Sequence, residues 1–193
     1  MTFIPYFIFM KITILNGDNS PDNSDFGEYV SQLQTLYINQ GHEVQVFNLS
    51  AMNLKYCIGC WTCWWKTPGR CVHKDDGELI FRSVINADFF IFASPLVAGF
   101  TTALLKKITD RLIVLLHPYI LIKEGEFHHH KRYEKYPEFG LLLSREITTD
   151  EEDIQIVEDM YKRLAINFHS RLRFVTLIND HQPEETAHAT YHF

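Results

Sequence analysis

The chain has 193 residues, 46% of them hydrophobic, and a formal net charge of −6. This length suits one domain with a sizeable buried core. The acidic balance and the lack of basic runs argue against nucleic acid or an anionic membrane surface as a partner.

The first ten residues (MTFIPYFIFM) are apolar, but Pro5 interrupts them and they are about half the length that a bilayer span requires. They lack the charged start and small-residue cleavage site of a signal peptide. The text from Met10 (MKITILNG) resembles a natural start, so we expect residues 1–9 to be an extension and residues 10–193 to be a single domain. Without an export signal, the expected location is cytoplasmic.

The first third of the chain predicts strand, helix and strand. Residues 11–15 (KITIL) are a β-branched run that ends at the turn Asn16-Gly17. Apolar residues recur at helical spacing over 25–39, and Gly41 follows as a stop signal. Residues 43–49 alternate polar and apolar side chains, as in an outer strand.

Six further elements are predicted from residue 75 onward. Asp75 and Glu78 have the spacing of a capping box, which favours a helix over 75–86. Residues 88–93 (DFFIFA) are typical of a central parallel strand, which we expect Ser94-Pro95 to end. The remaining predictions are a helix over 101–116, a strand over 139–143, a helix over 151–167 and a strand over 172–177.

Strand and helix thus alternate, which predicts a doubly wound α/β fold of three layers. The expected sheet is parallel and five-stranded, in the order 2-1-3-4-5. The tail after Ile178 is short and polar. We expect it to leave the last layer incomplete or completed by a partner chain.

Ligands of such sheets bind at the carboxyl ends of the strands, where three predicted loops meet. Residues 16–24 lead into a helix N-terminus, which favours a phosphate, and Ser20, Asn23 and Ser24 add donors. An equally weighted alternative is a simple turn with Ser24 as helix cap. In the second loop, 94–100, Gly99 allows close backbone approach, and Leu96, Val97 and Phe100 can pack on an aromatic ring. The third loop begins at Ser144.

The most specific motif is a cysteine cluster, CIGCWTCWWKTPGRC, with the spacing C-x2-C-x2-C-x7-C at Cys57, Cys60, Cys63 and Cys71. Three thiolates two residues apart are typical of iron–sulfur ligands. Zinc is a weaker alternative, because its sites more often use two separated C-x2-C pairs. The other interpretation is a set of reduced, partly buried thiols in a Trp-rich loop, to which we give at least as much weight as to the cluster.

Three consecutive histidines, His128, His129 and His130, lie in the polar stretch before the fourth predicted strand. Imidazole is a common metal ligand. Adjacent side chains cannot all point one way, however, so a solvated loop is expected here.

These segments resemble the NADPH-dependent FMN reductase-like group of the flavodoxin superfamily, which includes the iron–sulfur flavoproteins. The resemblance rests on MKITILNG, the block from Cys57 to Asp76, the Ser94-Pro95 loop and the segment from Lys106 to Arg111. It implies a flavodoxin-like fold, a bound FMN, NADPH or NADH as donor and a small electron acceptor. It also implies a homodimer or homotetramer and a [4Fe–4S] cluster on the four cysteines.

The resemblance also implies which residues hold FMN. The phosphate would lie in the loop that contains Gly17, Asn19, Ser20, Asn23 and Ser24. The isoalloxazine would lie along Pro95, Leu96, Val97 and Gly99, with Ser144 and Arg145 on its other side.

Two features depart from this family. The phosphate loop carries Asp18 and Asp22, with no Lys or Arg between Gly17 and Glu28. A carboxylate about 4 Å from a phosphate costs roughly 4 kcal/mol at an effective dielectric constant near 20. Both aspartates must therefore turn outward, or FMN binds weakly, or the ligand is not FMN. Leu96-Val97 also replaces the usual Val-Tyr.

The sequence therefore supports two hypotheses. In the first, the chain is an NAD(P)H-dependent FMN oxidoreductase, in which a cluster would relay electrons if it assembles. In the second, the chain is a flavodoxin-like module that has lost flavin and senses redox state or metal through its thiols.

Overall fold

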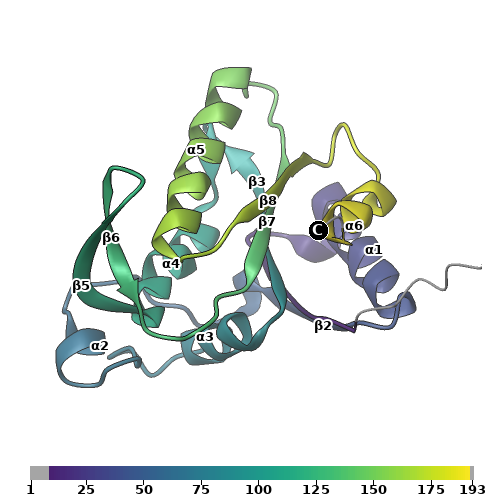
Figure 1. The fold of residues 1–193 in the computed structure, drawn as a ribbon. Coiled ribbons are helices and arrows are strands. Elements are labelled where there is room, and N and C mark those ends of the chain that lie inside the picture. The colour runs from purple at the N-terminus through teal and green to yellow at the C-terminus, as the bar shows by residue number, and fades with distance from the viewer. Residues whose placement is uncertain (1–8, 192–193) are drawn as a thin grey trace, which may run out of the picture.

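The computed structural model describes residues 9–191 and is built on one central sheet (Figure 1). The parallel strands follow the path β2-β1-β3-β7-β8. Their bounds are β1 Lys11–Asn16, β2 Glu43–Asn48, β3 Phe89–Val97, β7 Glu138–Ser144 and β8 Leu172–Leu177. The predicted α/β class with a mostly parallel sheet is confirmed.

The number of strands in the sheet differs from the predicted five. Pro95 does not end the central strand, because β3 continues to Val97 and turns back into the short antiparallel strand β4 (Phe100–Thr101). The sheet therefore has six strands. A separate antiparallel hairpin consists of β5 (Leu116–Lys123) and β6 (Glu126–Lys131). The expected single helix over 101–116 is instead α4 (Ala103–Arg111) followed by a 3-10 turn.

Helices cover both faces of the sheet and complete three layers. One face packs against α1 (Asp25–Asn39) and α6 (Pro183–Tyr191). The other packs against α3 (Gly77–Asn86), α4 and α5 (Glu151–Asn167). The one-turn helix α2 (Thr62–Trp65) lies in the cysteine segment. Among residues 9–191, no helix is long and apolar enough to cross a bilayer.

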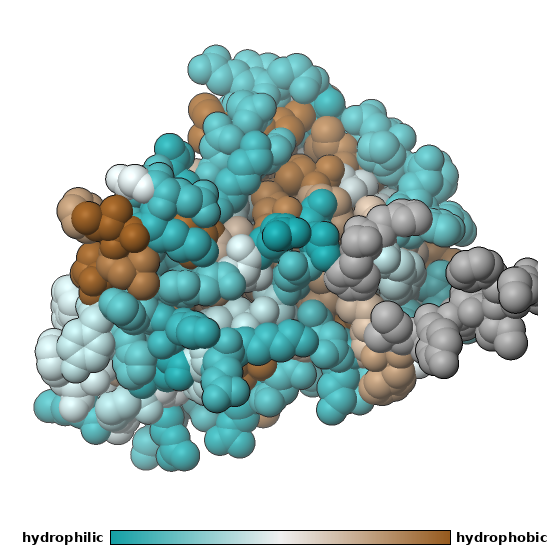
Figure 2. All heavy atoms as spheres, viewed as in Figure 1, coloured by the Kyte–Doolittle hydropathy of each residue, from teal (hydrophilic) through white to brown (hydrophobic). Residues whose placement is uncertain are grey.

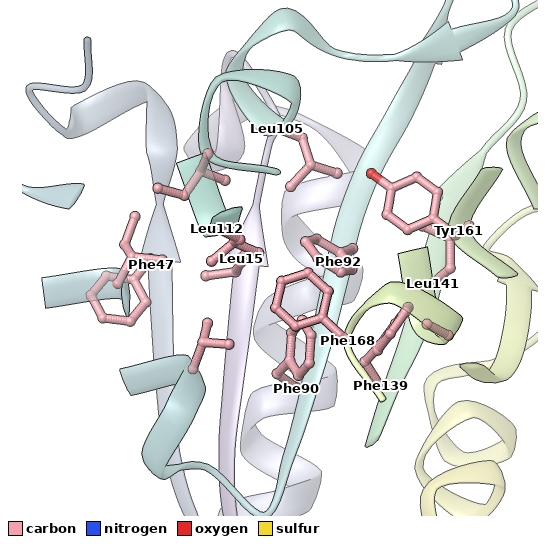
Figure 3. Packing of buried hydrophobic residues seen from close by; sticks show 14 of the residues in the cluster. Leu15, Phe47, Phe90, Phe92, Leu105, Leu112, Phe139, Leu141, Tyr161 and Phe168 are labelled. Carbon is pink, nitrogen blue, oxygen red and sulfur yellow. The ribbon is translucent and has the colours of Figure 1, made fainter. Parts of the chain in front are cut away.

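Side-chain alternation along β3 explains why this strand is central. Phe89 and Ile91 point to the α1 side, whereas Phe90 and Phe92 join the cluster on the other face. Figure 3 shows Phe90 and Phe92 packed beside Phe139 of β7. Burying a side chain of this size contributes about 1.5–3 kcal/mol, so the strand needs both layers.

The C-terminal segment closes the last layer, contrary to the prediction from its polar composition. Helix α6 packs on α1, and the hydroxyls of Tyr29 and Thr186 lie 2.6 Å apart. Tyr37 and Thr190 form a second such pair at 2.7 Å. Sequence patterning detects a buried helix by its apolar stripe. In α6, part of the buried face consists instead of threonines that pair with tyrosines of α1.

The expected extension, residues 1–9, falls almost wholly outside the described residues. Only Phe9 of that segment is described, and it is exposed.

Candidate functional site

Three loops meet at the carboxyl edge of the sheet, as predicted. In the parallel register Asn16 of β1 is opposite Ala93 of β3, and Pro95 is opposite Ser144 of β7. The loops that follow β1, β3 and β7 are therefore neighbours. This edge is where open α/β sheets bind their ligands.

Gly17 joins the first loop to the second. Its amide donates to the carbonyl of Ala93 at 2.8 Å, and its carbonyl accepts from the hydroxyl of Thr102 at 2.7 Å. A Cβ on Gly17 would lie 2.8 Å from both Thr102 Oγ1 and Leu105 Cβ. Close approach of α4 therefore requires a glycine here.

The loop from Gly17 to Ser24 already encloses an anion, the carboxylate of Asp18. This residue is 6% exposed, and its Oδ1 accepts from the amide of Ser20 at 3.0 Å. Its Oδ2 accepts from the hydroxyl of Ser24, whose Oγ also accepts from the amide of Gly27 at 2.9 Å and so caps α1. Asp22 is exposed. The requirement that both aspartates turn outward is therefore met by Asp22 and not by Asp18.

Asp18 also provides a test of whether this loop fits a flavin phosphate. Two donors converge on one carboxylate, which stands in for an oxyanion at the N-terminus of α1. The loop therefore has the donors that a phosphate requires. A phosphate bound here would have to displace Asp18, because both donors are already occupied.

The second loop is a tight hairpin turn. Ala98 and Gly99 have φ of +51° and +75°, the pattern of a two-residue turn between strands. Leu96 is buried in the core, whereas Val97 is about half exposed and Pro95 is partly exposed. A Cβ on Gly99 would lie 2.4 Å from Asp153 Oδ1. Here glycine is explained by the turn and by Asp153, and Val97 rather than Leu96 faces outward.

The third loop is connected to its surroundings through Arg145. The guanidinium pairs with Glu151 at 2.6 Å and with Asp180 at 3.5 Å, which raises the pKa of Arg145. The amide of Ala98 donates to Glu146 at 3.1 Å, so the second and third loops are in direct contact. Ser144 and Arg145 are both partly exposed at this edge.

The cysteine segment lies elsewhere, beside the β5–β6 hairpin (Figure 1). Burial raises the pKa of the Cys63 thiol, and the nearby thiols of Cys71, Cys60 and Cys57 raise it further. A hydrogen bond with Thr62 lowers the pKa of Cys60. The fold thus brings all four thiols together, and a positively charged centre would offset the repulsion between their thiolates.

All four cysteines line one cavity of about 700 Å³ between the cysteine segment, α4, α5 and the hairpin. Aromatic side chains form much of its wall, among them Trp61, Trp64, Phe100, Phe127, Tyr161 and Phe168. Among residues 9–191, no three His, Cys, Asp or Glu side chains are placed to hold a single metal ion. A cluster differs from a single ion, because it spreads its cysteine ligands over several irons.

Unpaired polar atoms in the cavity wall favour a ligand there. In the described part of the chain, five buried side-chain nitrogen or oxygen atoms have no hydrogen-bond partner. Three of them, Arg111 Nε, His128 Nε2 and His129 Nδ1, belong to residues that line this cavity. Because such atoms cost free energy when unsatisfied, a group with acceptor atoms fits the cavity.

The predicted solvated histidine loop is wrong. Residues 126–131 form β6, which pairs with β5. His128 is 6% exposed, and burial lowers the pKa of His129. Within β6, His128 is buried, His129 is partly buried and His130 is exposed, and both His128 and His129 line the cavity. A polar sequence does not reveal this burial, because it depends on packing of the hairpin against the rest of the chain.

Sequence reasoning also missed Arg111 and misinterpreted Asp75. Asp75 does not form the predicted capping box: its Oδ1 accepts from the amide of Gly77, the first residue of α3, and its carboxylate also pairs with the buried Arg111. One signal was available: Leu105, Ile108 and Leu112 recur at helical spacing and place Arg111 on the apolar face of α4.

Comparisons with known proteins agree with this architecture. The sequence profile of the family described as NADPH-dependent FMN reductase matches residues 10–131, more than half of the chain. An iron–sulfur flavoprotein of Archaeoglobus fulgidus is 38% identical over 79 residues, 41% of this chain and 35% of that protein. Another, of Clostridioides difficile, is 34% identical over 113 residues, 55% of this chain and 48% of that protein. The matched region thus spans less than half of either relative.

Among solved structures, the NAD(P)H:quinone oxidoreductase from Methanothermobacter marburgensis is similar in fold. It aligns with a TM-score of 0.59 at 19% identity, over 88% of this chain and 85% of that one.

Proposed function

This chain belongs to the NADPH-dependent FMN reductase family, and from that premise we propose that it passes electrons from NADPH or NADH through FMN to a small acceptor. The enzyme class is FMN-dependent oxidoreductase, with FMN as cofactor. The nicotinamide donor, the acceptor and a cytoplasmic location are parts of the proposal. The observation that carries it is the convergence of Ser20 N and Ser24 Oγ on one carboxylate beside two further strand-end loops.

Different residues would bind the phosphate and the ring system of FMN. Once Asp18 is displaced, the amide of Ser20 and the hydroxyl of Ser24 would hold the phosphate, with Gly17, Asn19 and Asn23 in the same loop. Pro95, Val97 and Gly99 would lie along the ring system, with Leu96 buried beneath them, and Ser144 and Arg145 at its other side. FMN, when bound, supplies the hydride and electron chemistry, and the protein supplies position and electrostatics.

For the second centre, we propose that Cys57, Cys60, Cys63 and Cys71 hold a [4Fe–4S] cluster. Support comes from the four neighbouring thiols, the cavity that they line and the unpaired Nε–H of Arg111. Two relatives of this chain are named iron–sulfur flavoprotein, and that name refers to a centre of the same type. Zinc is less favoured, because its sites more often use two separated C-x2-C pairs than three cysteines two residues apart.

A homodimer or homotetramer completes the proposal. On the hairpin, Ile122 and Phe127 are opposite each other in the strand register and are 71% and 77% exposed. Figure 2 shows a hydrophobic patch on the side of the molecule where Figure 1 places this hairpin. Exposed apolar patches of this kind mark protein–protein contacts.

The deciding experiment is a spectroscopic titration of anaerobically purified protein. FMN is added first, then iron and sulfide, and NADPH or NADH oxidation is followed with and without FMN. We expect flavin quenching, a broad band near 400 nm after iron and sulfide, and FMN-dependent oxidation. A chain that takes up no flavin at any concentration contradicts the oxidoreductase.

The alternative is a redox- or metal-sensing module without flavin, which the inward carboxylate of Asp18 favours. It predicts no flavin uptake in the same titration, and metal uptake that is lost when Cys57 or Cys60 is replaced by Ser.

A further inference from the structure

Arg111 and Asp75 form a buried ion pair beside the cysteine segment. Their side chains are 1% and 0% exposed. The Nη1 of Arg111 donates to Asp75 Oδ2 at 2.9 Å, and its Nη2 donates to Oδ1 at 2.8 Å. Such two-point pairs fix orientation as well as charge. Burial lowers the pKa of Arg111, but the hydrogen bonds with Asp75 and Cys71 outweigh burial and raise it.

This pair holds the two ends of the cysteine segment together. Lys55 precedes Cys57, and its amide donates to Asp75 Oδ2 at 2.9 Å while its carbonyl accepts from Arg111 Nη1 at 3.1 Å. Asp75 itself follows Cys71 in the chain. One guanidinium and one carboxylate therefore close residues 56–74 into a loop.

The guanidinium also has a free donor. Arg111 lines the cavity with all four cysteines and interacts with Cys71, yet its buried Nε–H has no acceptor among the described residues. A Cβ on Gly77 would lie 2.7 Å from Arg111 Nη2, so the helix beneath leaves room for the guanidinium. Leaving the buried Nε–H of Arg111 without an acceptor costs about 1–3 kcal/mol. An ion pair whose only role is to close the loop would not require this unsatisfied donor.

We propose that Arg111 is a positioning residue of the cysteine site: it closes the segment that carries the four thiols and donates its Nε–H to sulfur of the group that they hold. This inference rests on the proposed cluster. Hydrogen bonds to sulfur raise the reduction potential of a cluster, because they stabilise its more negative, reduced form.

The test compares Arg111→Lys and Arg111→Met with Arg82→Met, at an exposed arginine that pairs with Glu78 one helical turn earlier. Each full-length protein is reconstituted anaerobically with iron and sulfide. Iron per chain and the reduction potential are then measured, with circular dichroism as a check on folding. Arg82→Met should match the wild type.

For Arg111→Lys we expect retained iron and a potential lowered by at least tenfold in the one-electron equilibrium, about 59 mV. For Arg111→Met we expect at least a fivefold loss of iron. A purely structural role would not move the potential of the loaded cluster. Wild-type iron and potential in Arg111→Lys overturn this inference alone, whereas a wild-type chain that takes up no iron overturns the proposed cluster as well.

If Arg111→Lys does not fold, Asp75→Asn gives the same decision. This variant keeps the guanidinium near Cys71 but weakens the closure of the loop. Lower iron content at an unchanged potential supports the proposal, and unchanged iron content overturns it.

Discussion

The hydroxyl of Ser24 donates a hydrogen bond to the carboxylate of Asp18, so the anion inside the loop after β1 belongs to the protein itself. Ser24 is also the cap of α1, and its Oγ accepts from the amide of Gly27. In the proposed site, a flavin phosphate at this helix N-terminus would compete with an internal carboxylate, and the free energy of that competition would determine how tightly FMN binds.

Replacing Asp18 with Asn should strengthen FMN binding about tenfold or more. The change removes a charge that costs roughly 4 kcal/mol at 4 Å and an effective dielectric constant near 20, and less where water reaches the loop. Quenching of flavin fluorescence measures the dissociation constants of FMN and of riboflavin, which has no phosphate. Riboflavin affinity should not change.

Asp22→Asn is the matched control, because Asp22 lies in the same loop but is exposed. It should leave both affinities within about twofold of the wild type. If Asp18→Asn and Asp22→Asn behave alike, the inward carboxylate does not control phosphate binding.

The orientation of Asp18 shows where sequence reasoning stops. The strand over 172–177 and the helices over 25–39 and 151–167 were predicted with the bounds that the structure has, because local periodicity specifies them. The direction of the Asp18 side chain depends on Ser20 and Ser24 after the loop has folded. The sequence therefore shows that the loop carries a carboxylate but does not show which groups this carboxylate accepts hydrogen bonds from.

Tertiary contacts explain the other failures as well. The segment from Asp75 to Glu78 has a capping pattern, but Arg111, remote in sequence, takes the carboxylate of Asp75. The sequence of helix α6 is too polar to predict a buried helix by itself. Its threonines are buried because their hydroxyls pair with those of Tyr29 and Tyr37 of α1. Patterns that depend on a distant partner cannot be read from one segment.

Gly27→Ala should destabilise the protein, although Gly→Ala in a helix normally stabilises by about 0.5–1 kcal/mol. A Cβ on Gly27 would lie 1.8 Å from the carbonyl oxygen of Pro21, so the loop before α1 must move. We expect a loss of about 1–3 kcal/mol, as in other overpacked sites. Urea unfolding measures it, with Ser31→Ala on the exposed side of the same helix as control. Increased stability in Gly27→Ala would show that the loop yields freely.

Phe127→Glu should dissociate the proposed homo-oligomer. Phe127 and Ile122 form an exposed cross-strand pair on the hairpin, and a carboxylate there would be desolvated at an interface. Sedimentation or light scattering should show a multimer for the wild type and a monomer for Phe127→Glu. Leu79→Glu, at an exposed leucine on α3, should leave the assembly intact. A multimer that survives Phe127→Glu excludes the hairpin as the contact.

Tyrosines make stability fall in alkaline solution. Burial raises the pKa of Tyr161 to about 12 and raises that of Tyr37 further, whereas an unfolded tyrosine titrates near 10. Above pH 10 the unfolded chain therefore binds fewer protons than the folded chain, and the free energy of unfolding must decrease. Each such tyrosine contributes a slope of about 1.4 kcal/mol per pH unit until its folded pKa is reached.

Tyr37→Phe separates this titration from packing. The variant loses the hydrogen bond to Thr190, so at pH 8 it should be less stable by about 1 kcal/mol. Between pH 10 and 12 its stability should decrease less steeply than that of the wild type, because one titrating group is gone. Urea unfolding across this range measures both effects, with Tyr119→Phe on the exposed hairpin as control. Equal alkaline slopes for the wild type and Tyr37→Phe would mean that Tyr37 ionises in the folded protein, which its burial between α1 and α6 opposes.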